Sequence, residues 1–289
     1  MSFYLSKEVM PNDTLRTAFN ALAVKTFGFS FEDWYQKGYW SNFNLPYTLF
    51  QGNEAVANIS VNKLEVLIRG EIHNSIQLGT VMTEKAYRNQ GLSREIMEEI
   101  KHDWEDKCDF MFLFANKSVL DFYPRFGFEK KQQYQFETKA GKASGACRKL
   151  NMDLSCDRQM LRDYYVKTNP FSKIQVIHND SLLMFYCTSI MKDWIYYTPE
   201  YDAVVIAEQN HGRLRCMDVY CDQGKNLLDI LASVADADAK TVSLEFTPCD
   251  DCGWDVSLIQ DDEDTLFVLS KGETVLDNGR LLFPAISHT

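Results

Sequence analysis

The sequence has no apolar run of about 18 residues or more, so nothing in it predicts a membrane-spanning helix. Its first residues also lack a basic stretch followed by an apolar core, which is the pattern of a signal peptide. We therefore expect a cytoplasmic protein. A chain of 289 residues can form one large domain or two ordinary ones.

Positive charge is also scarce. The chain has 30 Lys and Arg against 41 Asp and Glu, a formal net charge of −11. This balance argues against nucleic acid or an anionic membrane as a partner. Most of the excess lies in residues 136–289, which hold 15 basic and 24 acidic residues, against 15 and 17 in residues 1–135. The acidic residues either keep the surface solvated or attract a cationic amine substrate.

The cysteines give little support for a metal site. The eight cysteines fit a reducing compartment as mostly buried thiols. Cys249 and Cys252 have the Cys-x-x-Cys spacing of zinc sites, and Cys216 and Cys221 could complete such a site. The latter two are five residues apart on a predicted strand, so we expect them to face opposite sides. We predict no metal.

The segment from Val81 to Ser93 carries the first functional signal. An apolar strand-like run precedes it, and apolar residues at helical spacing follow from Leu92. A helix start has backbone N–H groups without partners and partial positive charge. Gly91 permits close approach of a ligand, and Arg88 adds a cation. The segment therefore fits a pyrophosphate site, or an ordinary turn that carries a surface arginine.

A second segment, Asn116 to Phe128, follows another apolar strand-like run and reads Asn-Lys-Ser-Val-Leu-Asp-Phe-Tyr-Pro-Arg-Phe-Gly-Phe. Together the two segments resemble the GCN5-related N-acetyltransferase (GNAT) family. The first resembles its Arg-x-x-Gly-x-Gly/Ala loop, with Ser93 in the last place. The second resembles its Asn-x-x-Ser-x-x-Phe-Tyr-x-x-x-Gly-Phe segment. The resemblance covers roughly residues 1–135.

The order of predicted elements agrees with a mixed α/β sheet with flanking helices. In the first half we predict helices over 13–26, 31–38, 92–104 and 119–125, and strands over 47–51, 55–69, 71–81, 110–115 and 128–136. In the second half we predict helices over 157–167, 182–191 and 226–234, and strands over 203–209, 214–221, 242–247, 266–269 and 281–285.

The second half repeats the order of the first, which predicts a second, degenerate GNAT-like domain. At the position of the phosphate loop stands Cys221-Asp-Gln-Gly-Lys-Asn226, where Asp222 would repel an anion. We predict a GNAT catalytic domain over 1–136, a linker or hairpin over 137–150 and the degenerate domain over 151–289. This order is similar to that of tandem acetyltransferases of the enhanced-intracellular-survival type.

The resemblance implies acetyl-CoA as the acyl donor. It implies main-chain pairing of the strand end with the pantetheine arm and backbone contacts of the loop with the pyrophosphate, while Asn116 contacts the cofactor or a nearby water. The implied cofactor-binding residues are Val81, Met82, Thr83, Arg88, Asn89, Gln90, Gly91, Leu92, Ser93 and Asn116.

The resemblance also implies catalytic roles. Tyr123 stands at the family's tyrosine and would act as general acid for the departing sulfur. From the tandem resemblance, the C-terminal carboxylate of Thr289 is a candidate general base. Glu84, Glu71 and His73 are alternatives near the central strands.

The acceptor is not specified by a motif. We predict N-acetylation of a small, cationic primary amine such as an aminoglycoside, a polyamine or an amino-acid derivative. The aromatic residues from Phe29 to Trp40 fit either a stacked acceptor or an interface with the second half. Two other functions stay open: a non-catalytic acyl-CoA-binding sensor, and a transferase that uses aminoacyl-tRNA, which the negative charge disfavours.

Overall fold

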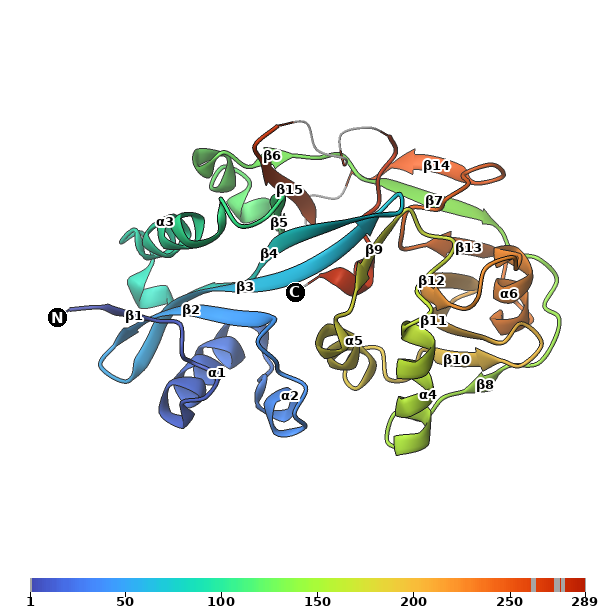
Figure 1. Ribbon diagram of the computed structural model, residues 1–289, viewed down its shortest axis with the longest axis horizontal. Helices are drawn as coiled ribbons and strands as arrows, with labels where there is room; N and C mark the ends of the chain where they lie inside the picture. The colour runs from blue at the N-terminus through green and yellow to red at the C-terminus, as the bar shows by residue number, and fades with distance from the viewer. Residues whose placement is uncertain (1, 261–263, 273–275, 277–278, 289) are drawn as a thin grey trace.

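The computed structural model describes residues 2–260, 264–272, 276 and 279–288. Two mixed sheets lie side by side, each with helices packed against it (Figure 1). Within these residues, every helix is too short or too polar to cross a membrane. The predicted mixed α/β class is confirmed.

The first sheet is built mainly from the N-terminal half. In spatial order it contains β1 (Tyr4–Ser6), β2 (Asn44–Gln51), β3 (Glu54–Ile68), β4 (Glu71–Thr83), β5 (Phe110–Ala115), β15 (Thr265–Ser270) and β6 (Glu129–Lys130), and β9 (Ile174–Ile177) pairs with the end of β3. Its β4 and β5 are parallel and are joined through a helix, whereas the other pairs are antiparallel.

Helices cover both faces of this sheet, as Figure 1 shows. On one face, α3 (Leu92–Trp104) packs its apolar stripe against Ile59 and Val61 of β3. On the other face lie α1 (Asp13–Phe27) and α2 (Glu32–Gln36). Asn12 caps α1, because its side chain accepts from the N–H groups of the first turn.

The second sheet repeats the first. In spatial order it contains β8 (Arg148–Lys149), β10 (Ile195–Thr198), β11 (Ala203–Asn210), β12 (Arg213–Tyr220), β13 (Thr241–Leu244), β7 (Tyr134–Lys139) and β14 (Asp255–Leu258), with helices α4 (Ser155–Tyr165), α5 (Asp180–Cys187) and α6 (Leu227–Val234). Again one pair, β12 and β13, is parallel and joined through a helix. The senses of all successive strand pairs match those of the first sheet.

The two halves exchange one strand each. In the first sheet, β15 from the C-terminal half lies between β5 and β6. In the second sheet, β7 from the N-terminal half takes the same place, between β13 and β14. Each sheet therefore contains a strand from the other half of the chain, across the domain limits predicted from the sequence. Because of this exchange, we expect the two sheets to fold as one unit.

Three predicted elements differ in the structure. The strand over 128–136 is divided into β6 and β7, which join different sheets and are separated by the polar residues 131–133. The helix over 119–125 is two 3-10 turns, Lys117–Val119 and Tyr123–Phe126. The strand over 281–285 is absent: the N–H groups of Leu282 and Phe283 are bound by side-chain oxygens of Thr247 and Gln133, and a 3-10 turn follows at Ala285–Ser287.

The prediction that Cys216 and Cys221 face opposite sides is wrong. Both thiols are buried in one apolar cluster of the second half. Cys216 and Asp218 of β12 pair with the consecutive residues Ala207 and Ile206 of β11, so Met217 between them has no partner. This β-bulge shifts the alternation of side chains by one residue and brings Cys216 and Cys221 to the same face. Cys249 and Cys252 are exposed. Among the described residues, no group of three or more His, Cys, Asp or Glu side chains could hold a metal ion.

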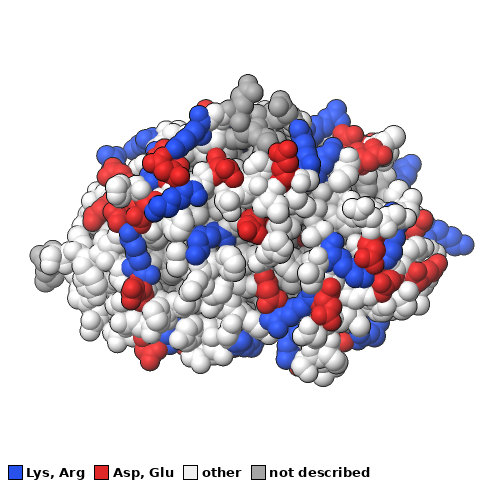
Figure 2. All heavy atoms as spheres, in the orientation of Figure 1, with Lys and Arg blue, Asp and Glu red and all other residues white. Residues whose placement is uncertain are grey.

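Charged side chains of both signs are interspersed on the face shown in Figure 2. Ion pairs occur in the acidic second half, such as Arg280 with Asp251 at 3.8 Å. Three acidic residues of this half, at positions 261–263, lie outside the described residues. On this face, Asp and Glu side chains are therefore mixed with Lys and Arg and do not form one acidic patch.

Because β15 is an interior strand of the first sheet, Leu266→Ala is expected to lower the free energy of unfolding of the whole protein by about 2–5 kcal/mol. The Leu266 side chain is fully buried. Urea unfolding measures the loss, and we expect one transition for both halves. The matched control is Leu258→Ala, at a position 41% exposed in β14, where we expect a change within about 0.5 kcal/mol. Two separate transitions would contradict the shared unit.

Candidate functional site

The parallel strands β4 and β5 separate before they end. They pair from Ser75 with Phe110 to Leu78 with Leu113, and no further pair follows in this parallel ladder. The rest of β4, Gly79–Thr83, keeps its pairing with β3 on the other side. A segment of β4 backbone therefore borders a gap in the sheet, where an extended ligand can pair with it like an added strand.

The separation coincides with a bulge in β4. Thr80 and Val81 together oppose one residue of β3, and Thr80 has a positive φ of 47°. Such a conformation is uncommon for a residue other than glycine. The Asn58 amide stabilises it by donating to the Thr80 carbonyl at 2.9 Å. Bulges of this kind change the direction of backbone groups and are frequent beside active sites.

The loop after β4 leads into the start of α3. Arg88, Asn89, Gln90 and Gly91 are all exposed, and Gly91 is the N-cap residue. No side chain of the described residues caps this helix start. Its first N–H groups therefore point to solvent with the positive end of the helix dipole, which is a favourable arrangement for an anion.

The backbone of this loop depends on two positive φ angles, 63° at Asn89 and 82° at Gly91. A Cβ atom at Gly91 would meet no protein atom within 4 Å. The glycine is therefore favoured by its φ and by the open space in front of it. Two bonds hold the loop to the strand: Thr83 Oγ1 with Ser93 Oγ at 2.8 Å, and Arg88 Nε to the Thr83 carbonyl at 3.3 Å.

Three of the sequence-predicted residues, Val81, Asn116 and Tyr123, line one cavity of about 380 Å³. This volume is within the usual range of ligand sites. Met82 does not line it, and its side chain is buried in the apolar cluster of α1 and α2. The loop residues Arg88 to Ser93 lie outside the cavity, beyond the end of β4.

Tyr123 lines this cavity and is buried. Its ring packs against Phe122, Phe128 and Phe267, the last from the exchanged strand β15. Burial raises the pKa of the Tyr123 phenol to about 12. The group therefore stays protonated, and able to donate, throughout the neutral range.

Asn116 follows the end of β5 and caps a 3-10 turn. Its side-chain oxygen accepts from the N–H and the hydroxyl of Ser118, at 3.0 and 2.6 Å. Because the oxygen is held in this way, the amide nitrogen is the group that remains for a ligand. Asn116 therefore both caps the turn and lines the cavity.

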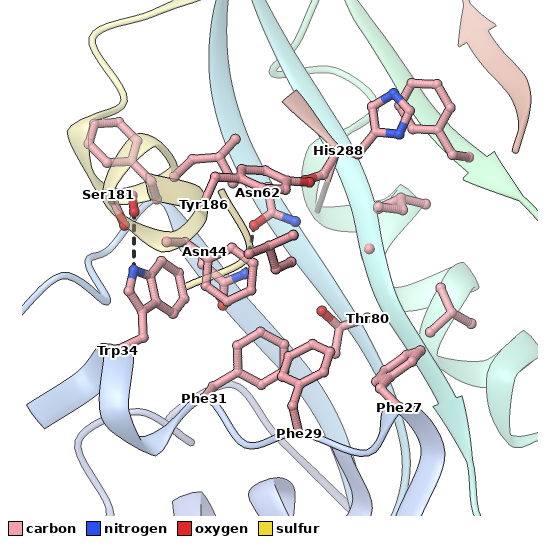
Figure 3. A pocket seen from close by; sticks show the side chains of 18 of the residues that line it. Phe27, Phe29, Phe31, Trp34, Asn44, Asn62, Thr80, Ser181, Tyr186 and His288 are labelled. Carbon is pink, nitrogen blue, oxygen red and sulfur yellow. Dashed lines mark hydrogen bonds between the residues drawn. The ribbon is translucent and has the colours of Figure 1, made fainter. Parts of the chain in front are cut away.

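Both halves of the chain form the outer wall of the cavity. Figure 3 shows Phe27, Phe29 and Phe31 along one side, across from residues of α5. Phe31 stacks on Phe185 at 5.8 Å, and Trp34 Nε1 donates to the Ser181 carbonyl at 3.1 Å. The aromatic region is therefore both an interface with the second half and a cavity wall.

The candidate bases lie elsewhere. Glu84 pairs with Lys25 at 2.7 Å, which lowers the pKa of its carboxyl, and it faces a different hollow beside α1. Glu71 and His73 are at the opposite end of β4. Thr289 lies outside the described residues. His288 before it lines the cavity, and its carbonyl accepts from the Tyr186 hydroxyl.

Comparison with protein-family models gives one match. Residues 12–130 match the model described as an acetyltransferase (GNAT) domain. The N-terminal part of this chain is a GNAT domain. The matched range includes the separated strands, the helix start and Tyr123. Comparison with curated protein sequences gave no match.

Solved structures share the fold of both halves. A probable N-acyltransferase of unknown function from Enterococcus faecalis has 15% identity and a TM-score of 0.65 over 93% of this chain and 72% of its own. A GCN5-related N-acetyltransferase from Kribbella flavida has 15% identity, a TM-score of 0.59 and coverages of 92% and 71%. Eis1 from Mycobacterium abscessus has 13% identity, a TM-score of 0.57 and coverages of 92% and 72%.

The corresponding helix start of the second half, that of α6, differs from the start of α3. The start of α6 is capped by the Asn226 side chain, which accepts from the Asp229 N–H at 3.2 Å. Lys225 donates to the carbonyls of Tyr201 and Asp202 instead of facing a ligand. In contrast to the start of α3, this helix start is therefore capped by a side chain of its own. Asp222, which we expected to repel an anion, forms an ion pair with Lys167 at 3.0 Å.

Sequence reasoning missed several residues of the cavity. Asn44 and Asn62 are buried polar residues on strands. Such residues are unusual in an apolar strand, and this pattern could have indicated a site. Phe185 and Tyr186 come from α5, more than 100 residues beyond β4, and their apolar helix gives no sign of a site. Only tertiary packing places them against the GNAT domain.

Proposed function

We propose that this protein transfers an acetyl group from acetyl-CoA to the primary amine of a small acceptor, with Tyr123 as general acid. The observation that carries this proposal is one cavity that contains Val81, Asn116 and Tyr123 at the point where β4 and β5 separate. The GNAT match supports acyl transfer as the reaction class.

The residues present fit acetyl-CoA, which supplies the acetyl group as an activated thioester. The uncapped start of α3 and the open space at Gly91 suit a pyrophosphate. Each backbone N–H bond to a charged acceptor contributes about 1.5–3 kcal/mol. The residues that would contact the pyrophosphate, mainly through backbone N–H groups, are Arg88, Asn89, Gln90, Gly91, Leu92 and Ser93. The main chain of Val81, Met82 and Thr83 would pair with the pantetheine arm, and Asn116 would contact it nearby.

The reaction forms a C–N bond and breaks a C–S bond. The acceptor amine must lose a proton before or during its attack on the carbonyl carbon, and the sulfur must gain one. Tyr123 is proposed to donate its phenol proton to the sulfur. Backbone N–H groups of the bulged segment at Thr80 are proposed donors to the carbonyl oxygen, where charge develops.

The proton of the amine needs an acceptor. The carboxylate of Thr289 stays a prediction for this role. It is supported by the position of the preceding residue, His288, in the cavity wall. A primary alkylamine carries a cation in neutral water, and the aromatic wall can hold one ammonium group over a ring. No nucleic-acid or membrane partner is proposed.

The raised pKa of Tyr123 predicts the alkaline side of the pH profile. Since the phenol ionises only near pH 12, kcat is expected to rise as the amine loses its proton and then to stay level up to about pH 10. Steady-state kinetics over this range measures the profile with wild type and with Tyr47→Phe, whose residue lies outside the cavity. A fall in kcat beginning near pH 8 would contradict the role of a buried phenol.

Two measurements test the proposed function. Acetyl-CoA is expected to raise the melting temperature, and a panel of primary amines is expected to release free thiol from it. Stabilisation by acetyl-CoA without thiol release on any amine would instead favour an acyl-CoA-binding sensor. No stabilisation would remove the proposal.

A further inference from the structure

The cavity beside Tyr123 is walled by uncharged side chains. Among the described residues that line it, none is Asp, Glu, Lys or Arg. His288 is the one titratable base in this wall, and its Nδ1 lies 3.0 Å from the Asp264 carboxylate, a residue that does not line the cavity. A ligand with several ammonium groups would lose hydration here without a carboxylate partner for each charge.

The outer part of the cavity is apolar and open to solvent. Four large apolar residues line it and are also exposed: Phe27 (44%), Phe29 (41%), Phe43 (41%) and Ile190 (57%). Single exposed apolar residues are ordinary on a protein surface, but a group around one opening indicates an apolar ligand. These residues come from α1, two loops of the first half and the segment after α5.

Most polar groups of the wall are bound to the protein itself. The Asn44 amide donates to Asn62 Oδ1 at 2.6 Å, and Asn179 Oδ1 accepts from the Leu182 N–H at 3.0 Å. The Ser181 hydroxyl donates to the Tyr39 carbonyl at 2.5 Å.

The Tyr186 hydroxyl likewise donates to the His288 carbonyl. These two bonds join α5 to the loop after α2 and to the C-terminal segment. Because these polar groups are already bonded to the protein, an acceptor would gain its binding energy mainly from burial of apolar surface rather than from hydrogen bonds.

An apolar cavity also assists the chemistry. Removal of an amine from water disfavours its charged form and lowers its pKa. The neutral amine is the form that attacks a thioester. Desolvation therefore assists the transfer of one proton from the amine to the base proposed above, the carboxylate of Thr289. The described wall offers no carboxylate for any further charge on the acceptor.

We propose that the acceptor is an apolar monoamine: one primary amine on an alkyl or aryl body, without a second charged group. The amine lies toward Tyr123, and the apolar body lies between the loop of Phe29 and the segment of Ile190. This assignment rests on the proposed acetyl transfer and narrows its acceptor. It disfavours the polyamines and aminoglycosides that are predicted from the sequence.

Two probes of equal size test the charge requirement. They are n-heptylamine and hexamethylenediamine, which have the same number of non-hydrogen atoms and differ in one terminal group. We expect kcat/KM for n-heptylamine to exceed that for the diamine by at least about tenfold. Calorimetric titration of both amines into the CoA-saturated protein gives the same comparison without turnover.

Two variants test the location. Phe29→Glu adds a carboxylate to the exposed rim, and it is expected to weaken n-heptylamine and strengthen the diamine. Ile72→Glu is the matched control: this apolar residue is 55% exposed at the far end of β4, and we expect no change in either amine.

The outcomes separate the two proposals. Preference for the diamine, or no binding of n-heptylamine to the CoA-saturated protein, would overturn the apolar monoamine. An equal response of Phe29→Glu and Ile72→Glu would also overturn it. Tight binding of n-heptylamine that depends on Phe29, without thiol release, would support the cavity assignment and contradict acetyl transfer.

Discussion

Replacement of Tyr123 by phenylalanine is expected to lower kcat by about 10²- to 10⁴-fold, which is the range for loss of a general acid. The hydroxyl is the only group removed. The ring contacts with Phe128 and Phe267 are kept, because phenylalanine has the same ring. The affinity for acetyl-CoA and the folded structure are therefore expected to stay close to those of the wild type, so the loss falls on kcat.

A change of leaving group separates chemistry from structure in this variant. A departing thiol with a lower pKa needs less help from an acid, so the defect of Tyr123→Phe is expected to shrink with an acetyl donor of that kind. A purely structural defect would be the same for both donors. Stopped-flow measurement of thiol release with the two donors gives the comparison.

The matched control is Tyr47→Phe. Tyr47 is equally buried, and its hydroxyl bonds to Asp103 at 2.6 Å outside the cavity. This variant is expected to lose about 0.5–1.5 kcal/mol of stability and to keep its kcat. Unchanged kcat in Tyr123→Phe would end the proposal that Tyr123 is the acid.

The second large effect is expected for Gly91→Val, which should weaken acetyl-CoA binding by about 10²- to 10⁴-fold. Valine is strained at a φ of 82°, so the loop must change its backbone. If two N–H bonds to the pyrophosphate are lost, each at about 1.5–3 kcal/mol, the affinity falls tenfold for about every 1.4 kcal/mol. Isothermal titration with acetyl-CoA measures the change.

Gly70→Val controls for the backbone strain. Gly70 has a φ of 90°, and a Cβ there also meets nothing within 4 Å, but it lies in the turn between β3 and β4, at the other end of β4. Both variants are expected to lose about 1–2 kcal/mol of stability. Only Gly91→Val is expected to lose affinity. Equal affinity in the two variants would show that the α3 loop does not bind the cofactor.

The first half was predictable because its signals are local. Strand, loop and helix follow each other between Ile76 and Trp104, so the positions of Arg88 and Gly91 depend on short-range structure. Tyr123 meets β4 because consecutive parallel strands lie next to each other. The mixed α/β fold and the GNAT domain follow from this local order.

The remaining features depend on long-range pairing. The run over 265–270 is a plain apolar strand, and nothing in its residues specifies a partner in the other half. The same holds for the helix that carries Phe185, whose contact with Phe31 joins positions far apart in the sequence. Side-chain bonds from Gln133 and Thr247 satisfy the backbone near Phe283 and replace a strand that the apolar pattern favours.

The central claim is that this chain has one acyl-CoA site, at the start of α3, and that α6 provides no second one. Calorimetric titration of the intact protein with acetyl-CoA tests it most directly. We predict one molecule bound per chain in the wild type and no measurable binding at the same concentrations in Gly91→Val. Two molecules per chain, or one that persists in Gly91→Val, would contradict the account.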